Sequence, residues 1–333
     1  MSVEFRPTRI SMLPKRGQIS WFEILSLSIS ILLIIPGIAP NFQDVILLSF
    51  LFGGLALAWN ISGGYAGLIS FGHSAFFGVG AYTSTILLVN YGVSPWIGVW
   101  IGALFSAVLG SVLALICARL RGPFFILSTL AFAEVVRIGA LNWSSLTGGP
   151  EGLSIMPTPL LTNMVFASKT TYAALMLTYL VLVYFVTKSL EASRFGYYLL
   201  AIRDNEDAAS AAGVNPLAGK TAALALSAAL TGVGGSLFAQ YFLYLDPTYM
   251  ISPELSFQFA LLPAVGGLGT AVGPVLGSFL ITPLSELLRS HLGNAAAGLH
   301  LVIYSFSLVI VMLYFPTGVA GALNRVSHWR PFS

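Results

Sequence analysis

The chain has 333 residues, of which 8% are charged and 56% are hydrophobic, and its formal net charge at pH 7 is +3. A soluble globular protein has about a quarter of its residues charged. The composition therefore excludes a soluble domain and predicts a protein embedded in the lipid bilayer. The basic residues form no single patch, so we expect no nucleic-acid partner. The one cysteine, Cys117, excludes a disulfide framework and a thiolate metal cluster, and we predict no metal and no cofactor.

Eight apolar runs are long enough to cross a membrane, since a crossing helix needs about 20 mostly apolar residues. The first run lacks a small-residue cleavage site and is predicted to be a retained span. The eight predicted spans are 21–40, 44–60, 73–91, 95–117, 123–142, 170–188, 221–243 and 299–315.

A further apolar stretch, 255–288, is interrupted by a glycine-rich segment, and its first part, 255–266, is too short to cross comfortably alone. We expect two short membrane-entering helices joined by a glycine-rich turn. The predicted fold class is thus an all-α polytopic membrane protein with about 8 to 10 transmembrane or re-entrant helices.

The lysines and arginines predict the orientation, because cytoplasmic loops are enriched in them. Twelve of the fifteen fall on one side if both termini are cytoplasmic. We therefore predict a cytoplasmic tail at 1–20, a permease domain at 21–320 with a cytoplasmic loop at 189–220, and a cytoplasmic tail at 321–333. The twelve are Arg6, Arg9, Lys15, Arg16, Arg119, Arg121, Lys188, Arg194, Arg203, Lys220, Arg325 and Arg330.

Two glycine-rich stretches, 60–82 and 265–274, predict helix breaks, and each contains a Gly-Gly pair. Such breaks line the substrate path in many transporters, where they occupy matching places in two halves. Glycines also permit close helix packing, and the two interpretations are compatible. The candidate pathway residues are Gly63, Gly64, Gly67, Ser70, Gly72, His73, Gly266, Gly267, Gly269 and Gly273.

Ionisable residues inside the predicted spans are few. Glu134 and Arg137 are three residues apart and are predicted to pair on one helix face. The pair has either a structural role or a role in transport, since charges in a membrane often mark function. For His73, a hydrogen-bonding role at the helix break is favoured over ligand binding or proton relay.

The loop at 189–220 contains a predicted helix over 199–212, which Gly213 ends and Pro216 follows as a stop. Asp207-Ala-Ala-x-x-x-Gly213 resembles the Glu-Ala-Ala-x-x-x-Gly signature of ATP-binding-cassette importer permeases, with Asp in place of Glu and without the downstream Ile-x-Leu-Pro. An ordinary solvated connecting helix is the alternative. The candidate residues for coupling to an ATPase are Arg203, Asp204, Glu206, Asp207, Ala208, Ala209 and Gly213.

The sequence does not predict a nucleotide site in this chain. The segment 213–221 is similar to a phosphate-binding loop, but it has five residues between its glycines where that loop has four. We therefore expect the chain not to be an enzyme and any ATP chemistry to come from a partner.

Five segments together resemble the permeases of branched-chain amino acid importers, the LivM/LivH type, and two of them resemble the M-type branch. The resemblance extends from about residue 45 to residue 320. The segments are 63–82, 129–137, 147–152, 201–209 and 266–274.

This resemblance implies an assembly in the bacterial inner membrane. Its parts are a second homologous permease, two cytoplasmic ABC ATPase subunits and a periplasmic or lipid-anchored substrate-binding protein. The second permease is either another chain or another copy of this one. The solutes implied are leucine, isoleucine and valine, with urea or short amides as the alternative within the family.

Three other classes of membrane protein compete with this interpretation. A purely structural membrane scaffold would leave the glycine-rich breaks and the coupling-like helix unexplained. A secondary transporter would more typically carry several intramembrane carboxylates, and Glu134 is the one candidate in this sequence. A membrane-embedded enzyme would need a catalytic constellation, and neither His-Glu-x-x-His nor Gly-x-Ser-x-Gly occurs. An ATP-driven permease remains the favoured class.

Overall fold

The computed structural model describes residues 43–117, 119–156, 161–292 and 318–319. The predicted spans 21–40 and 299–315 and both predicted tails lie outside the described residues. Its elements are α2 (Gln43–Asn60), the π-helical turn η2 (Ile61–Tyr65), α3 (His73–Tyr91), α4 (Pro95–Ile116), α5 (Pro123–Asn142), α6 (Ser144–Thr147), the 3-10 turn η3 (Gly149–Glu151), β1 (Leu153–Ser154), η4 (Leu161–Asn163), α7 (Lys169–Ala192), α8 (Arg194–Asp204), α9 (Glu206–Ala211), α10 (Pro216–Phe242), β2 (Tyr244–Leu245), α11 (Pro247–Met250), α12 (Pro253–Gly266) and α13 (Gly273–Leu292).

The structure confirms the prediction of an all-α polytopic membrane protein. Five helices of the described part are long and apolar enough to cross a membrane: α2 with η2, α4, α5, α7 and α10. Helix α3 occupies the predicted range 73–91. The strands β1 and β2 are two residues long and pair antiparallel, with Leu153 opposite Leu245.

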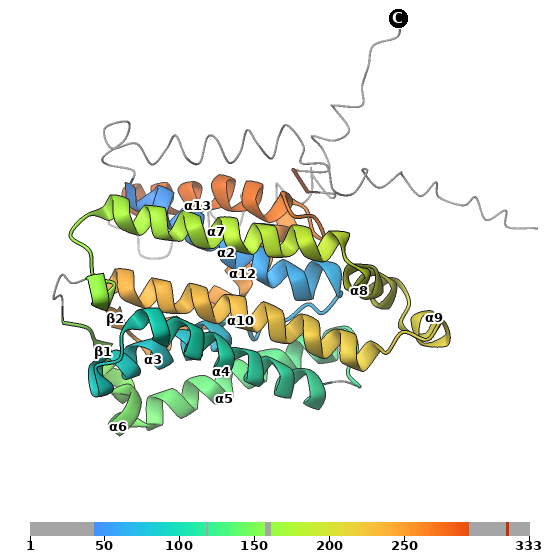
Figure 1. The fold of residues 1–333 in the computed structure, drawn as a ribbon, viewed down its shortest axis with the longest axis horizontal. Helices are drawn as coiled ribbons and strands as arrows, with labels where there is room; N and C mark the ends of the chain where they lie inside the picture. The colour runs from blue at the N-terminus through green and yellow to red at the C-terminus, as the bar shows by residue number, and fades with distance from the viewer. Residues whose placement is uncertain (1–42, 118, 157–160, 293–317, 320–333) are drawn as a thin grey trace, which may run out of the picture.

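The long helices lie side by side in a bundle that has two distinct ends (Figure 1). Helices α8 and α9 lie at one end, and α6 with the β1–β2 pair lies at the other. We call these the α8–α9 end and the β1–β2 end. Helix α2 packs against α7, α13, α10 and α12, while α10 also packs against α3 and α4.

Burial differs strongly among the spans. In the most apolar stretch of α2 with η2, 89% of the residues are buried inside the chain, whereas in α5 the share is 17%. Helix α2 is therefore the core of the bundle, and α5 lies at its edge.

The stretch 255–288 forms two helices joined by a non-helical segment, 267–272, as predicted. Helix α12 has 14 residues and is short, as expected. Helix α13 has 20 residues and so is about 30 Å long, which corrects the prediction of two short helices. The proline within α13, Pro283, does not end it.

The predicted helix over 199–212 is two helices, α8 and α9, which corrects the prediction of one. The interruption is Asn205, whose backbone is extended and whose side chain accepts a hydrogen bond from the backbone nitrogen of Ala208. Asparagine competes for backbone groups in this way and favours helix starts over helix interiors.

The predicted end of this segment is confirmed. Gly213 has a φ of +86°, and the backbone nitrogens of Gly213 and Val214 donate to the carbonyls of Ser210 and Ala209. This is the Schellman pattern that ends many helices at a glycine. Pro216 is the first residue of α10, where its missing N–H costs nothing.

Helices α3 and α10 approach closely through glycines. A Cβ atom added at Gly80 would lie 2.1 Å from the carbonyl oxygen of Gly232, and one at Gly235 would lie 2.0 Å from that of Phe77. Small residues at contacts between membrane helices allow this approach, and dispersion between the backbones then stabilises the pair.

We predict that Gly80→Ala lowers the stability of the protein, by about 1–3 kcal/mol, because the added methyl group forces two backbones apart. Gly139→Ala in α5 is the matched control, since no described atom lies within 4 Å of its added Cβ. That variant is expected to unfold at an equal or higher temperature, because alanine favours helices over glycine. Thermal unfolding of both variants in one detergent measures the difference, and equal midpoints would contradict the role of this contact.

Candidate functional site

The two glycine-rich breaks lie against each other. In the first, the Gly63–Gly64 pair lies in η2, and the non-helical backbone runs from residue 66 to residue 72. In the second, the non-helical backbone is 267–272. A Cβ atom added at Gly64 would lie 2.6 Å from the backbone nitrogen of Gly269, so the two backbones touch.

Asn60 joins the two breaks by hydrogen bonds. Its Nδ2 donates to the carbonyl oxygen of Thr270 at 2.9 Å, and its Oδ1 accepts from the backbone nitrogen of Gly269 at 2.9 Å. The Asn60 side chain is fully buried at the end of α2. One amide thus satisfies a donor and an acceptor of the second break, which a helix would otherwise have satisfied.

Glu191 makes a second link between the breaks. It lies in the last turn of α7, and its Oε1 accepts from the Tyr65 hydroxyl and from the backbone nitrogen of Ala271 at 3.1 Å. Tyr65 ends η2, and Ala271 belongs to the second break. The carboxylate also pairs with Lys188, at 3.3 Å.

Arg203 of α8 contacts both breaks. Its Nη1 donates to the carbonyl oxygen of Gly64 at 2.7 Å. Its Cγ would lie 2.7 Å from a Cβ added at Gly67, and its Nη1 would lie 2.9 Å from one added at Gly269. Gly67 and Gly269 both have a φ of +70°, which glycine adopts readily. The predicted coupling segment and the two predicted breaks therefore meet at one arginine.

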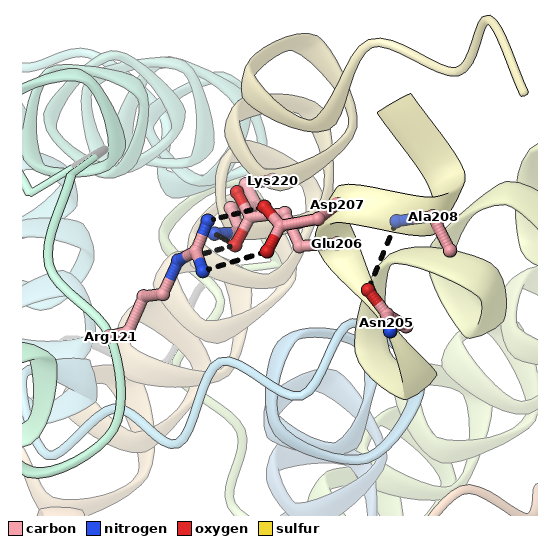
Figure 2. A network of polar contacts seen from close by, with 6 residues as sticks. All are labelled: Arg121, Asn205, Glu206, Asp207, Ala208 and Lys220. Atoms are coloured by element: carbon pink, nitrogen blue, oxygen red, sulfur yellow. Dashed lines mark hydrogen bonds and ion pairs between the residues drawn. The ribbon is translucent and has the colours of Figure 1, made fainter. Parts of the chain in front are cut away.

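Helix α9 is held by basic side chains from two neighbouring elements (Figure 2). Arg121, in the loop between α4 and α5, contacts Asp207 at 3.0 Å and Glu206 at 3.2 Å. Lys220 of α10 contacts Glu206 at 2.7 Å. We call these four residues the α9 clamp.

The charge state of the α9 clamp follows from its geometry. The Arg121 guanidinium holds the pKa of the Asp207 carboxyl below its usual range, because it donates a hydrogen bond to the carboxylate and attracts its charge. Asp207 is therefore ionised at neutral pH. The contact with Arg121 is present above the ordinary carboxyl pKa and is lost only as the pH falls through the lowered value.

A cavity of about 290 Å³ lies beside the α9 clamp. Its walls come from the first break, the α4–α5 loop, α8 and α9. It leaves space between the parts of the molecule that the clamp and Arg203 join.

Comparison with known proteins decides the family. The profile of the family described as "Branched-chain amino acid transport system / permease component" matches residues 41–313. The chain belongs to this permease family. The resemblance noted in the sequence is thereby confirmed, and the protein is a transport subunit of a multi-pass membrane type.

Three curated relatives have informative names. The "High-affinity branched-chain amino acid transport system permease protein LivM" of Salmonella typhimurium is 28% identical over 299 residues, covering 83% of this chain and 69% of the relative. The protein of the same name from Escherichia coli is 29% identical with the same coverage. The "Nucleoside ABC transporter permease protein NupC" of Lactococcus lactis is 24% identical over 287 residues, covering 79% of this chain and 88% of the relative. No solved structure matches the chain.

The remaining pathway candidates of this permease are tightly packed. His73 is buried at the start of α3, with its Nε2 2.8 Å from the Ser227 hydroxyl and its Nδ1 3.2 Å from that of Ser70. His73 therefore forms hydrogen bonds at the helix break, and the preference for this role over ligand binding or proton relay stays a prediction. A Cβ added at Gly72 would lie 2.8 Å from the carbonyl oxygen of Thr129, so this glycine has a packing role.

The other glycines of this set are also enclosed. A Cβ at Gly63 would lie 2.3 Å from the Trp59 ring, and those at Gly266 and Gly273 would meet backbone atoms within 3 Å. Gly267 has a φ of +135°, which favours glycine. Close packing is therefore a role of these glycines; that they also line a path stays a prediction.

Glu134 and Arg137 form the predicted ion pair on α5, with Arg137 Nε 2.8 Å from Glu134 Oε2. We call the contacts that Asn60, Glu191 and Arg203 make with the two breaks the junction. No hydrogen bond or ion pair joins Glu134 or Arg137 to the junction in the described part of the chain. The predicted site lacked Asn60 and Glu191, which join the breaks, and Arg121 and Lys220, which hold α9. A signal existed for Asn60, since an amide inside an apolar run beside a Gly-Gly pair needs a hydrogen-bonding partner.

We predict that Asn60→Leu destabilises the junction by about 1–3 kcal/mol for each backbone group left without its partner. The expected result is a lower thermal unfolding midpoint together with reduced transport. Asn142→Leu is the matched control, because the Asn142 side chain is exposed and its one hydrogen bond among the described residues is within its own helix, to the carbonyl oxygen of Ile138. Equal behaviour of the two variants would show that the Asn60 bridge contributes nothing.

Proposed function

We propose that this permease is the transmembrane subunit of an ATP-binding-cassette importer in the bacterial inner membrane, with both termini cytoplasmic. Separate ATPase subunits hydrolyse the ATP, and this chain forms part of the path. The observation that carries the proposal is the position of Arg203, which joins the predicted coupling segment to both glycine-rich breaks.

Helices α8 and α9 have the properties of a docking element. They lie together at one end of the bundle (Figure 1), and most residues of 203–213 are exposed. The exposed residues of α9 include the small side chains of Ala208, Ser210 and Ala211, which permit close approach of another protein. One of the two ATPase subunits would bind here, and it would move α9 when the nucleotide-bound pair closes.

The contacts of the site then give a route for that motion. The α9 clamp ties α9 to the α4–α5 loop and to α10, and Arg203 ties α8 to the breaks. Because Asn60 and Glu191 join the breaks to each other, a displacement of α8 acts on both at once. We propose that the breaks form the cytoplasmic gate of the solute path.

The solutes we propose are leucine, isoleucine and valine. This rests on the family and on two relatives whose names state branched-chain amino acid transport. The relative named for nucleoside transport favours nucleosides as the first alternative, and urea or short amides follow within the family. A periplasmic or lipid-anchored binding protein would select the solute, and a second homologous permease would complete the membrane part.

Affinity purification of the tagged chain in mild detergent tests the assembly. Recovery of a second permease and ATPase subunits is expected, followed by ATP-dependent uptake of labelled leucine in proteoliposomes that contain the binding protein. Inhibition of the labelled leucine uptake by a series of unlabelled competitors identifies the solute. Recovery of this chain alone, with transport that needs no ATP, would overturn the proposal in favour of a secondary transporter.

We predict that Arg121→Gln reduces leucine uptake several-fold per ATP hydrolysed, because α9 loses its two contacts with the α4–α5 loop. Arg119→Gln is the control, since Arg119 is exposed in the same loop and makes no hydrogen bond or ion pair with another residue of the described ranges. The ratio of uptake to ATPase rate, measured in proteoliposomes, separates the two variants. An unchanged ratio in Arg121→Gln would remove the clamp from the coupling route.

We predict a stronger loss of coupling for Arg203→Ala, because this change detaches α8 from both breaks while α9 and its clamp remain. Arg194→Ala, an exposed position at the start of the same helix, controls for the loss of a charge. The expected result is retained ATPase activity with little uptake. If Arg203→Ala and Arg194→Ala transport equally well, Arg203 does not carry the motion.

A further inference from the structure

His73 lies where the first break ends and α3 begins, and its imidazole meets hydroxyl groups from three segments of the chain. The side chain is fully buried. Its Nε2 lies 2.8 Å from the hydroxyl of Ser227 in α10 and 3.4 Å from that of Ser62 in η2. Its Nδ1 lies 3.2 Å from the hydroxyl of Ser70 in the first break. The other hydrogen bonds of these hydroxyl groups decide which ring nitrogen carries the proton.

The two hydroxyl groups beside Nε2 have no proton left to donate to the ring. A serine hydroxyl donates one proton, and a carbonyl oxygen only accepts. The Ser227 hydroxyl donates to the carbonyl oxygen of Ala58 at 2.7 Å. The Ser62 hydroxyl donates to that of Trp59 at 3.0 Å. Nε2 must therefore carry a proton of its own, which it donates to Ser227.

Nδ1 carries no proton, because the imidazole is neutral. A fully buried imidazolium would need a carboxylate beside it, and the neighbours of the ring among the described residues are hydroxyl groups and aromatic rings. Nδ1 then accepts from the Ser70 hydroxyl, whose oxygen accepts in turn from the backbone nitrogen of Gly72 at 3.2 Å. His73 thus accepts a hydrogen bond from the first break and donates one to α10.

Ser227 connects this chain of hydrogen bonds to the α9 clamp. It follows Lys220 by seven residues on α10, so the two lie about 10.5 Å apart along the helix and on nearly the same face. Lys220 contacts Glu206 of α9 at 2.7 Å. A displacement of α9 therefore has a route to the first break through α10, in addition to the route through α8 and Arg203.

We infer that His73 is a second positioning residue of the transport cycle: as a neutral imidazole with its proton on Nε2, it transmits the displacement of α10 to the first break. It acts through Ser227 on one side and Ser70 on the other. This role rests on the proposed function, which supplies the motion of α9. It involves neither solute binding nor proton transfer, because hydroxyl groups of the protein engage both ring nitrogens.

Two amide substitutions separate this role from simple packing. The amide nitrogen of glutamine reaches close to the position of Nε2, whereas that of the shorter asparagine reaches only the position of Nδ1. His73→Gln keeps a donor toward Ser227 and is expected to retain much of the leucine uptake per ATP hydrolysed. His73→Asn is expected to lower this ratio several-fold. The ratio is measured in proteoliposomes that contain the whole transporter, where a loss of folded protein lowers uptake and ATPase rate together.

A serine substitution tests the other end of the contact. Ser227→Ala removes the acceptor of the Nε2 proton and is expected to lower the ratio as His73→Asn does. Ser111→Ala is the matched control, because the Ser111 hydroxyl bonds within its own helix, to the carbonyl oxygen of Ala107. That control is expected to keep the ratio of the unchanged transporter.

The position of the proton is a readout that a packing role would not fix. Nitrogen-15 NMR of the full chain with labelled histidine, in mild detergent, is expected to show a neutral His73 ring protonated on Nε2, with His73→Gln assigning its signals. A proton on Nδ1, or a charged ring at neutral pH, would overturn the inference.

The uptake ratios give further outcomes that count against the role of His73. An unchanged ratio in His73→Asn or Ser227→Ala would overturn it, and so would an equal loss in His73→Gln and His73→Asn, which a packing role predicts. The proposed function would still stand in these cases if Arg203→Ala uncouples uptake from ATP hydrolysis. If Arg203→Ala also transports normally, both fail.

Discussion

The structure depends on one constraint: backbone groups released where a membrane helix breaks must find partners inside the protein. Both breaks meet this constraint together. Asn60 supplies an amide to the second break, and Arg203 supplies a donor to the first. Glycine makes the arrangement possible, because a side chain at Gly64 would occupy the space of the Asn60 amide and of the second break. The breaks are therefore stable only as a pair.

This mutual dependence explains why the coupling segment has two helices. The extended backbone at Asn205 lets α8 follow the breaks and α9 turn toward the α4–α5 loop and α10. Each part has its own anchor, Arg203 for α8 and the α9 clamp for α9. Exposed ion pairs such as those of Arg121 contribute little to stability, so the clamp serves to direct α9 more than to hold the fold. A link of this strength can rearrange during a transport cycle.

Sequence patterns predicted much of this fold and less of the site. Apolar runs of membrane-spanning length located α3, α4 and α5 within a residue or two, because hydrophobic length is decisive in a membrane. The division at Asn205 was missed, since good helix formers surround it and its capping role appears only in three dimensions. Glu191 and Arg121 were equally hidden. Glu191 lies far along the chain from the breaks that it joins, and Arg121 lies far from α9, so nothing local distinguishes either from an ordinary charge at a helix end or in a loop. Partners distant in sequence are set by packing, which a single sequence does not display.

Charges carry opposite meanings at different places in this molecule. At the α8–α9 end, the side chains of Arg121 and Asp207 are 62% and 80% exposed, so their pairing contributes little free energy and is easily reversed. On α5, Glu134 and Arg137 lie within a membrane-spanning helix, where charged side chains are costly unless they are paired. The first kind of pair can guide motion, and the second offsets the cost of its own charges. Helix α5 is the least buried of the membrane-spanning helices in the described part, with 17% of the residues in its most apolar stretch buried, so the pairing of these two side chains is what makes the charges tolerable there.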